Sequence, residues 1–362
     1  MKAAACSNSE RLATARPATR SASIPVRGRP QPCAAPIAPE AALGQRERRE
    51  RSPLWLRRWF DSRSGSGAAR SRDDVDWLRC LPFLAMHAAS LGVFWTGWSP
   101  VALGVAAASF LVRMFAITGF YHRYFSHRAF RTSRAFQALM AFVGGCAAQR
   151  DPMWWASHHA QHHSHSDAPG DPHSPSLSGF LGSHAGWFMT GEGFLTRSRF
   201  VRDWARFPEL RLLNRFDWVP PLLFAALVYL AGWALERWQP QLGTNGPQML
   251  AWGFFASTVC LYHATFTINS LAHGWGRRRF ATGDDSRNNW LLALLTLGEG
   301  WHNNHHHYPG AAQQGFYWWE LDITYYVLLS LRRLGLVWDL RTVPEHALAR
   351  NRVDFPAAGG AR

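Results

Sequence analysis

The sequence has few cysteines, and they form no recognisable pair. The five residues show no paired spacing and no C-x-x-C motif: Cys6, Cys33, Cys80, Cys146 and Cys260. This scatter argues against a disulfide framework and indicates reduced thiols that serve in packing. The chain also lacks a flavin or nicotinamide fingerprint and a C-x-x-C-H haem attachment motif. It therefore shows no sign of carrying any of these redox cofactors itself.

Acidic residues are scarce as well. There are 24 Asp and Glu against 39 Lys and Arg, which gives a formal net charge of +15 and a pI of about 10.7. Such an excess suggests a nucleic-acid partner. The 19 Trp, the 23 Phe and the long apolar stretches at 81–121 and 218–273 argue against one. The mean hydropathy of −0.19 hides these stretches because polar, Arg-rich ends dilute them. We expect no nucleic-acid partner.

Both ends of the chain are expected to be tails around a membrane domain at 76–342. Residues 1–75 are rich in Arg, Ala, Pro and Ser, which predicts disorder. The acid-poor composition up to Pro39 also resembles an organelle transit peptide, which stays an alternative. The run at 54–60 is predicted to lie on the membrane surface with its basic side chains toward lipid phosphates. Residues 343–362 form the second predicted tail.

Four segments are apolar enough to cross a bilayer, which takes about 20 residues. The predicted spans are 81–98, 101–121, 218–235 and 249–271. Gly97 to Pro100 forms a tight turn between the first two, and the last two are joined by a short, nearly uncharged connection. The expected fold is an all-α, multi-pass membrane protein in which two helical hairpins carry a cap with a histidine-rich site.

The distribution of arginine predicts the orientation of these spans. The chain before the first span, the stretch 122–217 and the chain after 273 are crowded with Arg, and Arg237 is the main exception at the hairpin tips. Positive charge stays in the cytoplasm, so the cap and both termini are expected on that side. Arg113, His87 and His263 lie within predicted spans, where ionisable residues are often functional. The favoured interpretation is that each faces another helix or an interface.

Histidine is abundant, and most of the 17 residues fall into four places. The pair His122 and His127 follows the second span. The single residue His273 ends the fourth span, four residues after Asn269. Two triplets have the form H-x-x-H-H: His159, His162 and His163, then His302, His305 and His306. Four further histidines are surplus to this pattern and are expected beside the ligands or at the surface: His158, His165, His184 and His307.

Helical spacing predicts how these side chains point. Positions i, i+3 and i+4 share one face of a helix, so each triplet is expected to point at one spot. A spacing of five separates side chains by about 140° on a regular helix, so His122 and His127 are expected to flank a site or serve different metal ions. Nine imidazoles are too many for one four-coordinate zinc and suit two metal ions. Iron, copper and zinc all accept imidazole, and spacing does not choose among them.

These residues closely resemble the membrane acyl-CoA desaturases, the family of stearoyl-CoA desaturase. The motifs occur in the family's order and at its spacing, over roughly residues 80 to 340. They are HRYFSHR at 122–128, HHAQHH at 158–163 with DPH at 171–173, NSLAH at 269–273 and GEGWHNNHH at 298–306. The resemblance implies that Asn269 approaches a metal through water and that nine histidines bind two irons: His122, His127, His159, His162, His163, His273, His302, His305 and His306.

The resemblance implies an oxygen-dependent enzyme that introduces a cis double bond near carbon 9 of a long acyl chain, with reduction of O₂ to water. The chain would be carried by coenzyme A or by a lipid. Electrons would come from a separate reductase and a small carrier, which the basic surface could dock. Trp154 and Trp155 are candidates for lining the acyl tunnel. Glu299, Asp171 and Asp167 are candidate acceptors for imidazole N–H groups.

Two other functions compete with this interpretation. A related di-iron fatty-acid or alkane hydroxylase would use a similar histidine set, although the NSLAH and DPH motifs favour a desaturase. A metal transporter with a histidine-rich loop is the remote alternative. Transporters usually place their ligands at the bilayer midplane, whereas the spans here lack carboxylates and the histidines gather at one face.

Overall fold

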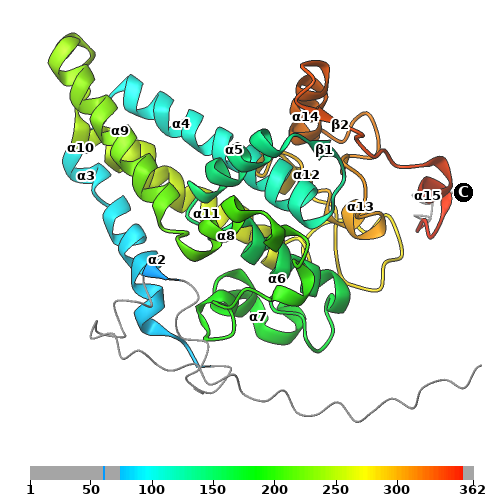
Figure 1. The fold of residues 1–362 in the computed structure, drawn as a ribbon. Helices are drawn as coiled ribbons and strands as arrows, with labels where there is room; N and C mark the ends of the chain where they lie inside the picture. Colours follow the sequence, from blue (N-terminus) through cyan, green and yellow to red (C-terminus); the bar gives the residue numbers. More distant parts are fainter. Residues whose placement is uncertain (1–59, 62–73, 354–362) are drawn as a thin grey trace, which may run out of the picture. The chain divides into compact units, whose positions relative to one another are not determined.

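The computed structural model describes residues 60–61 and 74–353. This part of the chain is mostly helical, with one two-stranded antiparallel sheet formed by β1 (Arg131–Thr132) and β2 (Val337–Trp338). Figure 1 shows the arrangement of these elements. The predicted N-terminal tail and the transit-peptide alternative lie outside the described residues, except for 60, 61, 74 and 75 of the tail. The predicted surface run at 54–60 also lies outside them, apart from its last residue.

Four helices are long and apolar enough to cross a membrane, which confirms the predicted fold: Trp77–Thr96, Pro100–Ser126, Val219–Trp238 and Gly246–Ser270. The first contains α2 (Trp77–Ser90) and α3 (Val93–Thr96), and the third is α9 (Val219–Trp238). The other two each contain a π-helical segment. The second joins α4 (Pro100–Phe115) to η1 (Ala116–Ser126), and the fourth joins α10 (Gly246–Met249), η6 (Leu250–Ala256) and α11 (Ser257–Ser270).

The first hairpin turns where the sequence predicted. Gly97 has a φ of 67°, a conformation that favours glycine. The Ser99 hydroxyl caps α4 by accepting from the backbone N of Ala102 at 3.0 Å, with Pro100 in the first turn. The same hydroxyl lies 2.6 Å from that of Thr244, in the connection of the second hairpin. This contact joins the tips of the two hairpins.

The ionisable residues of the spans face neighbouring helices. Arg113 is buried, and its guanidinium donates to the Thr258 hydroxyl of the fourth span at 2.6 Å. His87 of the first span and His263 of the fourth face each other with 3.1 Å between their Nε2 atoms. Polar contacts of this kind hold apolar helices together. The structure is therefore consistent with the interpretation that Arg113, His87 and His263 each face another helix.

The remaining helices gather toward one end of the spans and form the cap (Figure 1). A buried aromatic cluster around η1 is its core, with Phe120, Tyr124, Phe125 and Phe130 among its members. The α-helices of the cap are α5 (Arg134–Gly145), α6 (Pro152–His165), α7 (Pro175–His184), α8 (Pro208–Arg215), α12 (Trp290–Leu295), α13 (His302–His307), α14 (Ile323–Arg333) and α15 (Glu345–Ala349). Short 3₁₀ segments are η2 (Gly186–Met189), η3 (Ser198–Phe200), η4 (Trp204–Arg206) and, between α9 and α10, η5 (Pro240–Leu242).

The described residues beyond 342 pack on the cap. The Nε2 atom of His307 lies 2.7 Å from the Ala347 carbonyl oxygen in α15. The backbone N of Ala281 donates to the Asn351 carbonyl at 2.7 Å. The domain boundaries stay predictions, but residues 343–353 hydrogen-bond to the loop that follows the fourth span.

Candidate metal centre

The nine predicted histidines come together in two neighbouring groups, within each of which the potential ligand atoms lie no more than 4.8 Å apart. They lie on η1 and the residue just after it, on α6, on α13 and in the residues just after α11. The five-histidine position consists of His122, His127, His159, His163 and His305. The four-histidine position consists of His162, His273, His302 and His306.

Local structure orients the helix that carries the first triplet. Asp151 caps α6: its carboxylate accepts from the backbone N atoms of Met153 at 2.8 Å and Trp154 at 3.2 Å. Pro152 occupies the first turn, where its missing N–H costs nothing. The helix therefore begins at a defined residue, and this sets the direction of the imidazoles two turns later.

Each triplet is divided between the two positions, which corrects the prediction that its members point at one spot. The i+3 member of the α6 triplet, His162, belongs to the four-histidine position, while its two companions belong to the other. In α13 the i+3 member, His305, belongs to the five-histidine position. On a regular helix i+3 lies about 60° to one side of i, and i+4 about 40° to the other. The two helices therefore supply complementary sets.

The pair His122 and His127 belongs to a single position, which corrects the alternative that they serve different metal ions and leaves the alternative that they flank one site. The prediction assumed 3.6 residues per turn, whereas this segment is the π-helix η1. A π-helix pairs residues five apart, and the His127 backbone N donates to the His122 carbonyl at 3.2 Å. The two ring centroids are consequently only 4.9 Å apart.

Aspartates orient three of the four imidazoles in the four-histidine position. Each of these three imidazoles directs its Nδ1 atom at a carboxylate. The Nδ1 atom therefore carries the proton, and Nε2 is left with a lone pair. The Nδ1-to-oxygen distances are 3.0 Å for His162 and Asp171, 2.8 Å for His273 and Asp167, and 2.6 Å for His306 and Asp284.

The lone pairs that result face each other. Nε2 of His162 lies 3.3 Å from Nε2 of His306, and neither atom has a proton to donate to the other. The Nε2 atoms of His273 and His302 lie 3.0 Å apart, and Asp167 leaves Nε2 of His273 with a lone pair in the same way. Opposed lone pairs at this distance repel unless a cation lies between them. The donor set therefore fits a metal ion of the kind that imidazole binds.

In the five-histidine position the ring nitrogens also lie close together, but fewer carboxylates contact the imidazoles. The Nε2 atoms of His127 and His159 are 2.7 Å apart, and those of His163 and His305 are 2.9 Å apart. His122 contacts a carboxylate, Glu299. The described chain supplies no carboxylate within ion-pair distance of the other four imidazoles.

Burial keeps the imidazoles in the form that binds metals. Burial lowers the pKa of four imidazoles well below the ordinary histidine value, and neighbouring imidazoles add to the effect. These four are His159, His163, His302 and His305. Burial also lowers the pKa of His306 to about 4, although the Asp284 carboxylate opposes this. For Asp167, burial alone would raise the pKa, but the hydrogen bonds that its carboxylate accepts from His273 and Ser174 outweigh it and bring the pKa to about 2. At neutral pH these five imidazoles are therefore neutral, and the Asp167 carboxylate is ionised.

The three acidic residues singled out from the sequence, Glu299, Asp171 and Asp167, each contact a predicted ligand, whereas Asp284 and Arg123 were missed. Asp284 lies in a polar loop between two motifs, and no spacing indicates it. Arg123 had a signal, because it adjoins a predicted span where a cation needs a partner. Its guanidinium is buried and lies 3.0 Å from Glu299 and 2.9 Å from Asp322.

The surplus histidines lie outside both positions. Nε2 of His158 contacts the Leu195 carbonyl oxygen at 3.0 Å, so its neighbour His159 is the one that joins the cluster. Nδ1 of His184 lies 2.9 Å from the Ser270 hydroxyl. The ring of His307 stacks on Phe280 at 3.9 Å. His165 is partly exposed at the end of α6.

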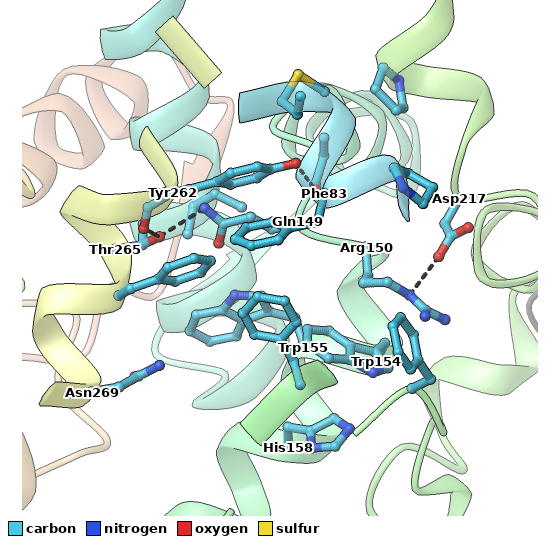
Figure 2. Close-up of a pocket in the computed structure, with 18 of the residues that line it drawn as sticks. Phe83, Gln149, Arg150, Trp154, Trp155, His158, Asp217, Tyr262, Thr265 and Asn269 are labelled. Carbon is cyan, nitrogen blue, oxygen red and sulfur yellow. Dashed lines mark hydrogen bonds and ion pairs between the residues drawn. The ribbon is translucent and has the colours of Figure 1, made fainter. Parts of the chain in front are cut away.

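A cavity of about 690 Å³ adjoins the histidine cluster. Its lining includes Glu299, Asn269 and four of the predicted ligands, and most of the remainder is aromatic or aliphatic. Figure 2 shows Trp154 and Trp155 across the cavity from Phe83 and Tyr262. The four predicted ligands of the lining are His122, His159, His162 and His302, and His158 and His173 also line the cavity.

Trp155 touches both the cavity and the cluster. Its ring stacks on His159 with 5.1 Å between centroids and an angle of 27° between planes. Trp154 is held by a hydrogen bond from Nε1 to the Gly193 carbonyl at 2.9 Å. One polar pair of the wall is the 2.6 Å contact between Arg150 and Asp217 (Figure 2). A long hydrocarbon chain in this cavity would lie beside the ring nitrogens.

Comparisons with known proteins agree with this arrangement. Residues 96–339 match the family model described as fatty acid desaturase. The chain is 34% identical over 278 residues to the sn-1 stearoyl-lipid 9-desaturase of Anabaena variabilis, covering 76% of this chain and 97% of that protein. It is 34% identical over 267 residues to the chloroplastic palmitoyl-monogalactosyldiacylglycerol delta-7 desaturase of Arabidopsis thaliana, covering 72% and 68%. It is 36% identical over 235 residues to the acyl-CoA C20 Delta5-desaturase of Anemone leveillei, covering 64% and 71%.

Proposed function

The chain belongs to the fatty acid desaturase family, and we propose that it uses two iron ions and O₂ to place a cis double bond in a long saturated acyl chain. The family identifies it as an oxidoreductase and favours desaturation over the hydroxylase and transporter alternatives. The proposed position of the bond is near carbon 9, as in two of the relatives, a stearoyl-lipid 9-desaturase and a delta-9 acyl-lipid desaturase.

One observation carries the proposal of a metal centre. The Nε2 lone pairs of His162 and His306 face each other at 3.3 Å while an aspartate holds the Nδ1 proton of each ring. This arrangement would be unfavourable without a cation, and it lies beside an apolar cavity. We propose that the nine clustered histidines hold the irons, with Asn269, which lines the cavity, as a further ligand through water.

The reaction requires an oxidant because the C–H bonds of a saturated chain are not acidic. Two bound irons with O₂ would supply that oxidising power. The protein's own residues hold the imidazoles in fixed directions through their carboxylates. Trp155 and the other aromatic side chains of the wall exclude water and would align the acyl chain, so that only one pair of carbons lies beside the cluster.

The substrate, the orientation and the electron source are also part of the proposal. Relatives are named for acyl-lipid and for acyl-CoA substrates, and we propose a long-chain acyl group on one of these carriers. The arginine distribution supports a cytoplasmic cap. Electrons would come from a separate carrier protein and its reductase, docked on the basic cytoplasmic surface.

Expression of the full-length protein in a desaturase-deficient host tests the proposal. We expect a new cis-monounsaturated fatty acid by mass spectrometry, absent from cells with an empty vector, and about two irons per purified chain. A hydroxylated product in place of the alkene would contradict desaturation. A correctly folded, membrane-integrated protein without stoichiometric iron would contradict the metal centre.

A further inference from the structure

The charge around the two metal positions is unequal. In the four-histidine position, Asp171, Asp167 and Asp284 each contact one imidazole. The fourth imidazole, His302, has a buried Nδ1 atom that finds no partner among the described residues. Three carboxylates therefore surround four imidazoles.

The other hydrogen bonds that these aspartates accept within the described chain come from neutral groups. Asp171 accepts from the backbone N of Asp167 at 2.9 Å, and Asp167 accepts from the Ser174 hydroxyl at 2.6 Å. Asp284 accepts from the Thr282 hydroxyl at 2.9 Å. Within the described chain, no Lys or Arg lies within ion-pair distance of any of the three. Their three negative charges are therefore not neutralised by a basic side chain of the described residues, and they would attract a cation bound by the histidines.

The five-histidine position has a carboxylate that is already paired. Glu299 contacts His122 and also accepts from Arg123, whose Nη2 lies at 3.0 Å. Arg123 in turn lies 2.9 Å from Asp322. All three charged side chains are buried, and together they carry one net negative charge against three at the other position.

This difference in charge outweighs the difference in ligand number. A fifth imidazole replaces one neutral ligand, such as water, by another, whereas each carboxylate attracts a dication directly and makes its imidazole more basic. A bound dication is the largest local charge in such a site. Buried charge of opposite sign therefore has the greater effect on its affinity.

We propose that the four-histidine position binds its divalent cation more tightly and is filled first, with Asp167, Asp171 and Asp284 as the positioning residues that set this order. The inference rests on the proposed metal-dependent function and deepens it. The five-histidine position is filled second because the Arg123 guanidinium offsets the charge of Glu299.

A metal titration of the full-length protein tests this order. The protein is purified in detergent, stripped of metal with a chelator and titrated with Co²⁺ against a competing indicator, with the visible spectrum as the readout. We expect two equivalents to bind, the first at least about tenfold more tightly than the second, since each outer partner contributes roughly 10–100-fold to affinity.

Two variants form a matched pair, each losing one carboxylate charge. Asp284→Asn should weaken the first equivalent by about 10–100-fold and leave the second nearly unchanged. Glu299→Gln should weaken only the second. Asp284→Glu keeps the charge and should preserve the order of filling, which separates a charge effect from a loss of fold. Gel filtration and thermal unfolding check that each variant is folded.

Equal affinity of the two equivalents would overturn the inference, as would weakening of the first equivalent by Glu299→Gln. Failure here is distinct from failure of the proposed function. If the wild-type protein forms unsaturated fatty acids in the host but its two equivalents bind alike, the function stands and the order of filling is wrong. If no unsaturation and no iron are found, the proposed function itself has failed.

Discussion

The histidine cluster and the adjoining cavity are built in opposite ways. In the cluster four of the nine imidazoles are directed by a carboxylate, as His273 is by Asp167 at 2.8 Å. The cavity wall depends mainly on the shape of aromatic and aliphatic side chains such as Phe83 and Trp155. Directed contacts tolerate little change because a lost partner leaves a buried group unsatisfied. A substitution in the apolar wall changes the space available by a small amount and should change activity gradually. We therefore expect the cluster to control whether the reaction occurs and the cavity to control which carbons react.

The largest effect is expected from removal of a clustered imidazole. His302→Ala or His162→Ala should abolish the new unsaturation, because each residue belongs to the four-histidine position and lines the cavity. Fatty-acid profiles of the host provide the measurement. His165→Ala is the matched control, since this histidine lies on α6 but outside both positions, and it should retain activity. Substantial unsaturation with His302→Ala would break the contrast between the two regions.

A substitution behind the cluster should have the next largest effect. Gly298 has a φ of 129°, and an added Cβ would overlap the Asp322 carboxylate and lie 3.1 Å from the Arg123 guanidinium. Gly298→Ala should therefore disrupt a buried ion pair, at a cost of about 3–5 kcal/mol in the free energy of unfolding, and remove most activity. Thermal unfolding and product yield are measured together. Gly104→Ala, where a Cβ meets nothing within 4 Å and Ala favours the helix α4, should lower neither.

The cavity should give a graded response. Ala89 of α2 lines the cavity, and Ala89→Phe reduces the space for the acyl chain. We expect a several-fold shift toward shorter products, with iron content unchanged, in chain-length profiles of the unsaturated fatty acids. Leu91→Phe is the control, because Leu91 is exposed and absent from the lining. A complete loss of product with Ala89→Phe would show that shape and chemistry are not separable here.

The smallest effect on product is expected at the start of α6. Burial raises the pKa of Asp151 from 3.8 to about 6. A raised folded-state pKa means that this carboxyl stabilises the fold when protonated, and that this contribution is lost as the pH rises from about 4 through about 6. Asp151→Asn cannot ionise and should gain stability relative to wild type between pH 5 and pH 7.5, by roughly 1.4 kcal/mol. Thermal unfolding at the two pH values measures it, and a pH-independent difference would contradict the assignment.

Much of the architecture could be predicted because its signals are local. Hydropathy located all four spans to within a few residues, and the turn from Gly97 to Pro100 lies where its residue types indicated. The nine clustered histidines were recognised from their spacing and their resemblance to one family. The partner of His306 was not, since Asp284 lies in a loop 22 residues before it and no periodicity connects the two.

The sequence by itself determined the membrane helices, the set of histidines and the family, because apolar runs and short motifs act within a few turns of chain. Only the tertiary structure decided which imidazoles share a position. That division depends on the π-helical turn between His122 and His127 and on how α6 and α13 each direct the i+3 imidazole to one position and the other two imidazoles to the other. The tertiary structure also decided which imidazoles have a carboxylate partner. Asp167 contacts His273, and Glu299 contacts His122, each from a segment more than 100 residues away. Such contacts arise from packing in three dimensions, which spacing along the chain does not encode.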